Sequence, residues 1–444
     1  MSPLATRRAS LTRLGALGFA GTALATLGGC GTVVRALREE TRGMASPGPS
    51  DRRRAETAWR YFRSTRNGAT GLCEAVAGAG FASATSIADQ IAAGLCAYRL
   101  GVVSRVDFDA AMSALLAFLA RAPLAGGALP GRFYAVATGA LIDPPAASGD
   151  PGWSGIQLGR LLLWLRALTD RFEQYRVPVA TIVARWRICD ALDDEGRICE
   201  GLPGNPQGLA RQPEIGAGYA IYAEQGYRAW GLSPARTVPL ASDFAVTVEG
   251  QDFAIGGLGS KRPPLQIMPY ALLGLELGWK GVSGSDLSAE KALLARMFDV
   301  QDRRRARTGI LTARADFKRT SAPYALIGGI VAGGTPWGTV GEDGTAFPEF
   351  GLLATKASFA MWALGAPGAK ETMAATDTLF DGGGGWLEGR YETSGAQEWT
   401  RSAATNAVVL EALLYRELGP VIDKAEPAAL TPDGTAGFAC PQAR

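Results

Sequence analysis

The sequence predicts an all-α fold, an (α/α)6 toroid of helical hairpins with a few short strands or hairpins in its loops. Helical periodicity starts near Trp59 and is interrupted repeatedly by loops rich in glycine and proline. The loops between the predicted helices are alternately short and long, which favours helix pairs stacked into a ring. With 47% hydrophobic residues, the chain can bury a sizeable core.

The spacing of apolar residues predicts about twelve helices. In chain order they span 51–65, 84–100, 105–121, 153–173, 177–188, 214–230, 266–278, 287–305, 321–333, 352–365, 369–379 and 400–418. Residues 240–258 alternate more like a strand pair or an active-site loop. A hairpin is predicted over residues 187–199, around a turn at Asp193–Gly196.

The first 30 residues are typical of an export signal. Arg7 and Arg8 precede an apolar stretch, Leu14 to Leu27, that is too short and too rich in glycine to span a membrane stably. The arginine pair is typical of a twin-arginine signal, and Leu-Gly-Gly-Cys, ending at Cys30, is typical of a lipoprotein cleavage site. We therefore expect Cys30 to carry a lipid. The alternative is an ordinary signal peptide with an incidental cysteine.

These features divide the chain into four parts. Residues 1–30 form the export signal, 31–54 a flexible tether, 55–420 the barrel domain and 421–444 a C-terminal tail. The expected location is the periplasmic face of the cell envelope, with the membrane reached through the N-terminal lipid anchor.

Charge and composition exclude several classes of function. Three arginines within residues 1–30 account for the whole formal net charge of +3, so no basic stripe is left to bind nucleic acid. The chain contains no histidine, which excludes Ser-His-Asp and Cys-His catalysis and zinc sites with histidine ligands. We expect no metal and no cofactor. Glycoside hydrolysis, which needs only two carboxyl groups, fits this restriction.

Five cysteines follow Cys30, and an exported protein can oxidise them. Cys189 and Cys199 stand almost symmetrically about the Asp193–Gly196 turn, so we predict that a hairpin joins them in a disulfide. A Cys73–Cys96 pair is also open, and Cys440 would then be left over.

Three acidic residues occur on otherwise apolar helix faces: Asp89, Glu276 and Glu411. A carboxylate in such a place is paired or hydrogen-bonded, or burial raises its pKa. One interpretation is a structural acid that pairs with an arginine or caps a helix. The functional interpretation is that these faces line the central cleft, with Asp89 or Glu276 as the catalytic acid.

The segment "GGGGWLEGRYETSG", Gly382 to Gly395, presents two further glutamates, Glu388 and Glu392. In an extended chain their Cα atoms would lie about 13 Å apart, too far for the carboxyl pair of a glycosidase. Arg390 lies between them and favours their ionised forms. We therefore predict that Glu388 is the catalytic base or nucleophile and that the acid comes from elsewhere in the chain.

Aromatic and polar residues near these acids are candidates for binding sugars. Trp153, Trp386 and Tyr391 have the flat apolar faces and polar tips that sugar stacking requires, as do Trp337 and Trp399, although such residues are as often part of a core. The candidates for hydrogen bonds to the substrate are Arg390, Glu392, Lys356, Thr405 and Asn406.

Several motifs together resemble a bacterial envelope family described as a domain of unknown function, number 3131. The matching segments are "AWRYF", "TGL", "PGWSGIQLGRLLLWL", "VARWRIC", "AIYAEQGYRAWG", "PYALLGLELGW", "RTGILTARAD", "LATKASFAMWAL" and "GWLEGRYE…TNAVVLEALLY". They stand in family order from about residue 55 to 420. This family is similar to the (α/α)6 glycosidases of the glucoamylase and β-1,2-glucanase type and often accompanies polysaccharide synthesis machinery.

The resemblance implies a six-hairpin helical barrel, a polysaccharide or oligosaccharide ligand, and polysaccharide synthesis machinery as a partner. In glucoamylase-like barrels one catalytic carboxylate commonly lies in the loop before the last inner helix, the place that Glu388 takes here. The chain departs from the family pattern at Gln157 and Ala220, where acids are usual. If either acid is catalytic in relatives, this chain binds glycans without cleaving them.

The leading hypothesis is an exported glycoside hydrolase that acts on an envelope or extracellular polysaccharide through paired carboxylates. A non-catalytic glycan-binding lipoprotein that assists polysaccharide assembly or export is the alternative, and a structural envelope scaffold is a third.

Overall fold

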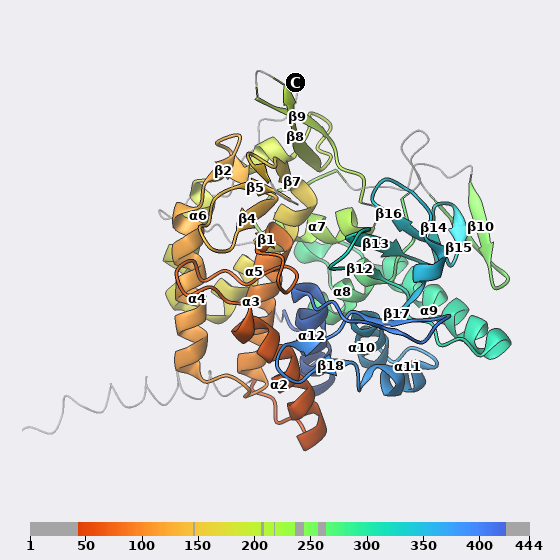
Figure 1. Ribbon diagram of the computed structural model, residues 1–444. Coiled ribbons are helices and arrows are strands. Elements are labelled where there is room, and N and C mark those ends of the chain that lie inside the picture. The colour runs from red at the N-terminus through yellow and green to blue at the C-terminus, as the bar shows by residue number, and fades with distance from the viewer. Residues whose placement is uncertain are drawn as a thin grey trace, which may run out of the picture. The chain divides into compact units, whose positions relative to one another are not determined.

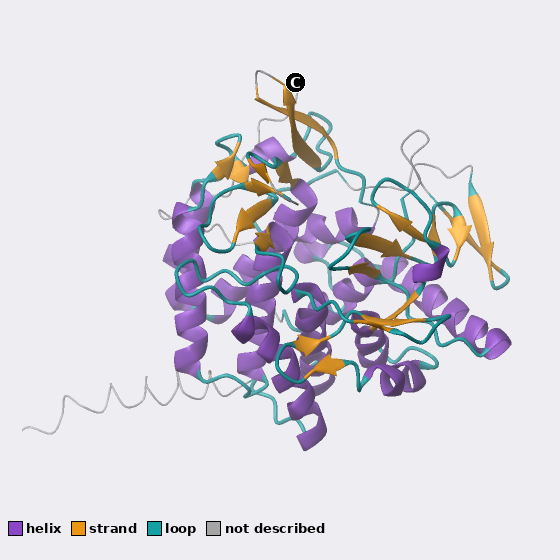
Figure 2. Cartoon of the chain, in the orientation of Figure 1, coloured by secondary structure: helices purple, strands orange, loops and turns teal. Residues whose placement is uncertain are grey.

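Helices make up most of the regular structure, and short strands occupy the connections between them (Figures 1 and 2). The computed structural model describes residues 43–144, 147–205, 208–216, 218–235, 244–255 and 263–422. All elements below belong to the unit that begins at Ala45. Within the described residues the helices are α2 (Pro49–Ser64), α3 (Ala84–Arg99), α4 (Arg105–Arg121), α5 (Gly155–Arg171), α6 (Arg176–Ala184), α7 (Gly218–Arg228), α8 (Met268–Leu277), α9 (Ser288–Thr308), α10 (Thr355–Ala363), α11 (Ala369–Thr376) and α12 (Ala403–Leu418).

Six of these helices contact one another in a closed order: α3, α5, α7, α8, α10, α12 and back to α3. They are buried on nearly all sides, as in α8, where every residue from Met268 to Leu277 is buried. The other helices pack outside this order, with α2 on α3 and α12, α4 on α3, α6 on α4 and α5, α9 on α8, and α11 on α10. These are amphipathic, with α4 burying one face and exposing the other.

Glycine permits the closest of the contacts between the six inner helices. A Cβ atom on Gly226 of α7 would lie 1.8 Å from the carbonyl oxygen of Gly159 in α5, so only glycine fits there. The backbones of α5 and α7 therefore meet directly, with no side chain between them.

The connections differ in length on the two sides of each inner helix. Short connections, 100–104, 172–175, 278–287 and 364–368, follow α3, α5, α8 and α10. Long connections that contain strands precede the inner helices. The described strands are β1 (Phe81–Ser83), β2 (Leu124–Ala125), β3 (Leu129–Pro130), β4 (Phe133–Ala135), β5 (Ile142–Asp143), β6 (Ala147–Ser148), β7 (Trp153–Ser154), β8 (Cys199–Asn205), β9 (Gly208–Pro213), β10 (Ala245–Val248), β11 (Gln251–Ala254), β12 (Asp316–Lys318), β13 (Ala325–Gly328), β14 (Val331–Ala332), β15 (Thr335–Pro336), β16 (Thr339–Gly341), β17 (Leu352–Ala354), β18 (Phe380–Asp381), β19 (Gly385–Trp386), β20 (Gly389–Tyr391) and β21 (Gln397–Glu398).

The long connections pair with one another, always antiparallel. Strand β1 pairs with β4, β7 with β8, and β17 with β20, which links the loops before α3 and α5, α5 and α7, and α10 and α12. Isolated bridges join Val76 to Ser402 and Leu265 to Val331. The loops that lead into the inner helices thus lie together at one end of the helices, and this is the end where a site can be built from many loops.

Most of the predicted helices are confirmed, with one exception. Residues 321–333 were expected to be helical, but they contain β13 and β14 instead. Gly328 and Gly329 explain the difference, because a Cβ on either would come within 2.7 Å of a backbone oxygen of another segment. The glycines allow close contact between strands and weaken a helix. The predicted strand pair within 240–258 is confirmed as the hairpin of β10 and β11.

The predicted disulfide between Cys189 and Cys199 is wrong, although the turn between them is present. Cys199 is a buried free thiol, as are Cys73 and Cys96, and Cys189 is disulfide-bonded. The isolated bridge pairs Leu192 with Ile198, so the register places Cys199 opposite residue 191, two residues away from Cys189. Residues Ile188–Ala191 also form a 3-10 turn, which takes Cys189 out of the hairpin.

No helix among the described residues is both long enough and apolar enough to cross a membrane. The export signal, the lipidation site at Cys30 and nearly all of the C-terminal tail lie outside the described residues.

Candidate active site

A lysine and an aspartate meet where α7 and α10 begin. Lys356 follows β17 directly in the first turn of α10, and its Nζ donates to Asp316 Oδ2 at 2.8 Å. The hydroxyl of Tyr219, in the first turn of α7, donates to Asp316 Oδ1 at 2.9 Å. Asp316 is the first residue of β12, so this strand joins the starts of two inner helices through one carboxylate.

Glu388 lies next to Lys356, and its backbone is held on both sides. Its N–H donates to the Thr400 carbonyl at 2.8 Å, and its carbonyl accepts from the Thr355 N–H at 2.9 Å. The side chain is fully buried, at 0% exposure. Among the described residues neither of its carboxylate oxygens has a hydrogen-bond partner of good geometry.

The pKa values of these two carboxyl groups are shifted in opposite directions. Burial raises the pKa of Glu388, although the Lys356 charge and nearby hydroxyls oppose the shift. Burial acts on Asp316 in the same sense, but Lys356 and the Tyr219 hydroxyl outweigh it and hold the pKa of Asp316 below its ordinary value. The cation with the largest effect on the pKa of Glu388 is thus Lys356, where Arg390 was expected, and burial outweighs it.

Glu214, which follows β9, is a third carboxyl group at this end of the inner helices. Its Oε1 accepts from the Ser154 hydroxyl at 2.5 Å, and its Oε2 accepts from the backbone N–H of Ile156 in the first turn of α5 at 3.0 Å. Burial raises the pKa of Glu214 to about 7, against these two hydrogen bonds. Glu214 therefore lies at the start of α5, Asp316 at the starts of α7 and α10, and Glu388 at those of α10 and α12.

Deeper between the inner helices, Arg160 of α5 holds three carboxylates. Its Nε donates to Asp89 Oδ1 at 2.9 Å, its Nη1 to Glu276 Oε1 at 2.8 Å, and its Nη2 to Glu411 Oε1 at 3.2 Å. The Tyr222 hydroxyl also accepts from Nη1 at 2.6 Å and donates to Glu276 at 2.6 Å. No side chain of the four charged residues is more than 7% exposed.

This arrangement, the Arg160 cluster, accounts for the acids on apolar helix faces. Asp89 and Glu276, the predicted candidates for the catalytic acid, are paired with an arginine inside the core, which agrees with the structural interpretation. Burial raises the pKa of Glu411 well above its ordinary value, and the neighbouring Glu276 adds to the shift. Asp89 interacts electrostatically with Lys356, so the cluster and the Asp316–Lys356 pair are neighbours.

The predicted stacking tryptophans Trp153 and Trp386 have almost no accessible ring surface. They are 5% and 1% exposed. The indole of Trp386 donates to the Arg54 carbonyl at 3.1 Å, and Asn406 accepts from its backbone N–H at 2.8 Å. Asn406, predicted to bind substrate, is thus engaged in holding the loop before Glu388. Thr405 is fully buried in the first turn of α12.

Of the predicted residues that follow Glu388, Glu392 is held in an ion-pair group and Tyr391 contacts a second one. Glu392 receives two hydrogen bonds from Arg314, at 2.8 and 2.7 Å, and an ion pair from Arg304 at 2.9 Å, and its side chain is 1% exposed. The Tyr391 hydroxyl donates to Glu398. Arg390 is partly exposed on β20. Of the predicted binding residues, Lys356 lies beside both the Asp316 and the Glu388 carboxyl groups, and the Thr405 hydroxyl lies near Glu388.

Three residues of the site were not predicted: Asp316, Tyr219 and Glu214. Asp316 lies outside the predicted helices and Glu214 is the first residue of the predicted helix 214–230, and no local pattern distinguishes either of them from a surface acid. Arg160 could have been found, because a single arginine interrupts the apolar run "IQLGRLLLWL" and matches the acids on the other apolar faces.

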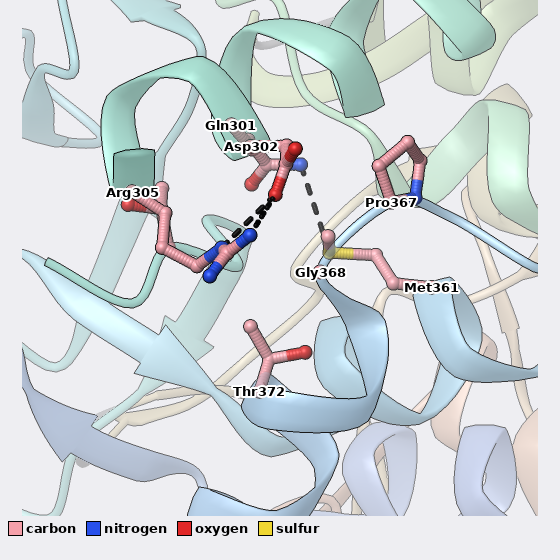
Figure 3. Close-up of a pocket in the computed structure, with 8 residues that line it drawn as sticks. Gln301, Asp302, Arg305, Met361, Pro367, Gly368 and Thr372 are labelled. Carbon is pink, nitrogen blue, oxygen red and sulfur yellow. Dashed lines mark hydrogen bonds and ion pairs between the residues drawn. The ribbon is translucent and has the colours of Figure 1, made fainter. Parts of the chain in front are cut away.

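Within the part of the chain that the structure describes, no three acidic or cysteine side chains are grouped to hold a metal ion. Figure 3 shows a depression between α9, α10 and α11, where Arg305 is directed at Asp302 and the Gln301 amide at the Met361 sulfur. It has no room for a water molecule and is lined by α9, α10, α11 and the loops that adjoin them.

The chain has the fold of several solved carbohydrate-related structures. A putative glucoamylase from Bacteroides fragilis matches with a TM-score of 0.60 and 14% identity over 84% of this chain and 92% of that one. The endo-β-1,2-glucanase from Chitinophaga pinensis, in complex with sophorotriose and glucose, matches with a TM-score of 0.60 and 12% identity, over 84% of this chain and 93% of that one. The endo-β-1,2-glucanase from Talaromyces funiculosus matches with a TM-score of 0.53 and 12% identity, over 84% of this chain and 84% of that one.

No curated protein matches the sequence. The model of one family, described as "Protein of unknown function (DUF3131)", matches residues 53–419. The match covers the inner and outer helices and all the loops that carry the candidate site, so the chain belongs to the DUF3131 family.

Proposed function

We propose that the protein is a glycoside hydrolase built as an (α/α)6 toroid with α3, α5, α7, α8, α10 and α12 as its inner helices. The observation that carries the proposal is the set of carboxyl groups at the starts of these helices, whose surroundings shift their pKa values in opposite directions. Glycoside hydrolysis needs one protonated carboxyl group and one carboxylate.

In this proposal Glu214 is the general acid. With a pKa of about 7, much of it is protonated at neutral pH, and the group is partly exposed. It gives its proton to the glycosidic oxygen as the bond from that oxygen to the anomeric carbon breaks. The position at the start of α5 then favours the carboxylate that is left behind.

Asp316 is the carboxylate partner. It is ionised at neutral pH, and its side chain is 28% exposed, so it can reach water and substrate. It takes a proton from the water whose oxygen bonds to the anomeric carbon. Lys356 and Tyr219 hold it in place and keep it charged.

Glu388 has a different role here from the predicted one of base or nucleophile. Its burial and raised pKa favour the neutral acid. A neutral Glu388 does not compete with Asp316 for the ion pair with Lys356. Glu388 therefore acts as a positioning residue for Lys356. The proposed substrate is an envelope or extracellular polysaccharide. The similarity to glucoamylase and β-1,2-glucanase structures supports the polysaccharide, and its place outside the cytoplasm rests on the export signal in residues 1–30.

Reducing-sugar release from a panel of glycans that includes β-1,2-glucan tests these roles. Asp316→Asn and Glu214→Gln should each lower release by at least about 100-fold, whereas Glu388→Gln should keep part of the activity. Glu195→Gln, whose side chain is 67% exposed, is the matched control and should release sugar as the wild type does. Full activity of Asp316→Asn would overturn the proposal, and complete loss in Glu388→Gln alone would restore Glu388 as the base.

A non-catalytic glycan-binding role is the second candidate, because Gln157 stands where the family pattern has an acid. Its Oε1 atom is buried without a hydrogen-bond partner among the described residues. Binding of a glycan without release of sugar by the wild type would establish this role.

We also propose export and a lipid anchor at Cys30, on the strength of the signal in residues 1–30. Membrane fractionation and labelling with radioactive palmitate test this. Cys30→Ser should lose the label and leave the membrane fraction, and an unchanged distribution would argue for an ordinary signal peptide.

A further inference from the structure

Two large aromatic side chains, Trp399 and Tyr324, stand exposed on neighbouring loops. Trp399 is 68% exposed and Tyr324 57%. Tyr324 belongs to the turn between β12 and β13, and Trp399 lies just after β21. The two loops touch, because the N–H of Thr320 donates to the hydroxyl of Thr400 at 3.1 Å.

Polar contacts fix both loops in place. The Arg319 N–H donates to the Tyr324 carbonyl at 2.8 Å, which closes the turn. The Arg319 side chain donates to Glu398 Oε2 at 3.3 Å and lies over the Phe350 ring. Glu398 in turn accepts from the Thr400 hydroxyl at 2.7 Å. The exposed rings are thus carried by rigid loops, which reduces the entropy that a ligand would lose on binding.

The same loops lead to the proposed active site. The Thr400 carbonyl, next to Trp399, accepts the N–H of Glu388. Asp316 begins the strand that ends at the turn of Tyr324. Because side chains alternate along a strand, Asp316 and the exposed Lys318 share one face, with the buried Phe317 on the other.

The surroundings of the two rings distinguish a sugar from an apolar protein partner. Arg319, Lys318 and Glu398 flank them, and the rings themselves end in an indole N–H and a phenol O–H. An apolar ring face with polar neighbours matches a sugar, which has C–H faces and hydroxyl edges. The buried Trp153 and Trp386 have no such accessible face.

We propose that Trp399 and Tyr324 form an outer sugar-binding platform, which holds a glycan chain whose reacting linkage lies at Asp316. The platform rests on the proposed function, since it extends the same site. It makes the protein selective for chains long enough to reach from Asp316 along β12 to the turn.

The test compares β-1,2-glucan oligosaccharides of increasing length as inhibitors or substrates, together with affinity electrophoresis in gels that contain the polysaccharide. Trp399→Ala and Tyr324→Ala should each weaken binding of long chains by roughly tenfold and weaken binding of the shortest cleaved chain by less. Trp399→Phe should restore part of the affinity. Val177→Ala, with 71% exposure on an outer helix, is the control and should bind as the wild type does.

Two results would overturn the platform while sparing the hydrolase. One is equal affinity of the wild type and Trp399→Ala for every chain length. The other is a change of oligomeric state in Trp399→Ala on size-exclusion chromatography with unchanged affinity, which would make the rings an interface between copies. Failure of the wild type to bind or cleave any glycan in the panel would overturn the platform and the proposed function together.

Discussion

The two groups of charged residues among the inner helices have similar compositions but differ in what they can do. Asp316, Lys356 and Glu388 combine two carboxyl groups with one cation, and the Arg160 cluster combines three with one. In the first group Asp316 is 28% exposed, whereas in the Arg160 cluster no charged side chain exceeds 7%. The arginine uses all three nitrogens within the protein. Accessibility of an ionised carboxylate, and not the presence of buried acids, marks the candidate site.

Arg160→Met gives the largest expected effect on stability. Without the guanidinium, three buried carboxyl groups lose their partner, which should lower the free energy of unfolding by about 3–5 kcal/mol. Denaturant-induced unfolding followed by circular dichroism measures the loss. Arg303→Met, which removes a half-exposed pair with Asp299, should cost no more than about 0.5 kcal/mol. Equal stability of Arg160→Met and the wild type would contradict the structural role of the cluster.

Lys356→Met should affect activity more than stability. Without the ammonium, the pKa of Asp316 rises, because the main group that holds it down is gone. Because the reaction needs ionised Asp316, the loss of activity on acidification then begins at a higher pH than in the wild type. We expect a loss of roughly tenfold or more at neutral pH and an acid limb of the kcat/KM profile displaced upward. An acid limb at the same pH as in the wild type would show that Lys356 does not control the pKa of Asp316.

These two predictions show what the sequence could and could not reveal. The helices and the acids on their apolar faces follow from spacing, since burial of a face leaves a regular pattern. That Asp89, Glu276 and Glu411 meet one arginine depends on contacts between helices far apart in the sequence, which bring α3, α8 and α12 close to α5. Asp316 and Glu214 lie in strand-containing connections whose paths are set by pairing with distant loops, so local sequence gave no signal for them.

Glu214→Gln tests the acid on the other side of the proposed mechanism. The general acid must be protonated, and the pKa of Glu214 is about 7, so activity of the wild type should decline as the pH rises above about 7. In the glutamine variant the residual activity should be lower by about 100-fold and should lack that decline. If the decline of activity above about pH 7 persists in the variant, a group other than Glu214 causes it.

The smallest effect is expected from Glu411→Gln, which tests the Arg160 cluster through the pH dependence of stability and not of activity. The folded state raises the pKa of Glu411, so it keeps a proton that the unfolded chain releases above a pH of about 4.5. The stability from Glu411 is therefore full below that pH and is lost as the pH rises toward the folded-state pKa, by at most about 1.4 kcal/mol per pH unit. Glutamine carries a permanent N–H in place of this proton and can still accept from Arg160. The variant should therefore match the stability of the wild type near pH 4.5 and be more stable than the wild type at pH 7 to 8 in unfolding experiments.

Glu276→Gln is the contrasting variant. The Glu276 carboxyl group accepts from both Arg160 and Tyr222, and an amide cannot replace both bonds, so this variant should be less stable at every pH. A Glu411→Gln variant that loses stability as steeply with pH as the wild type would show that the proton of Glu411 does not cause the pH dependence of stability.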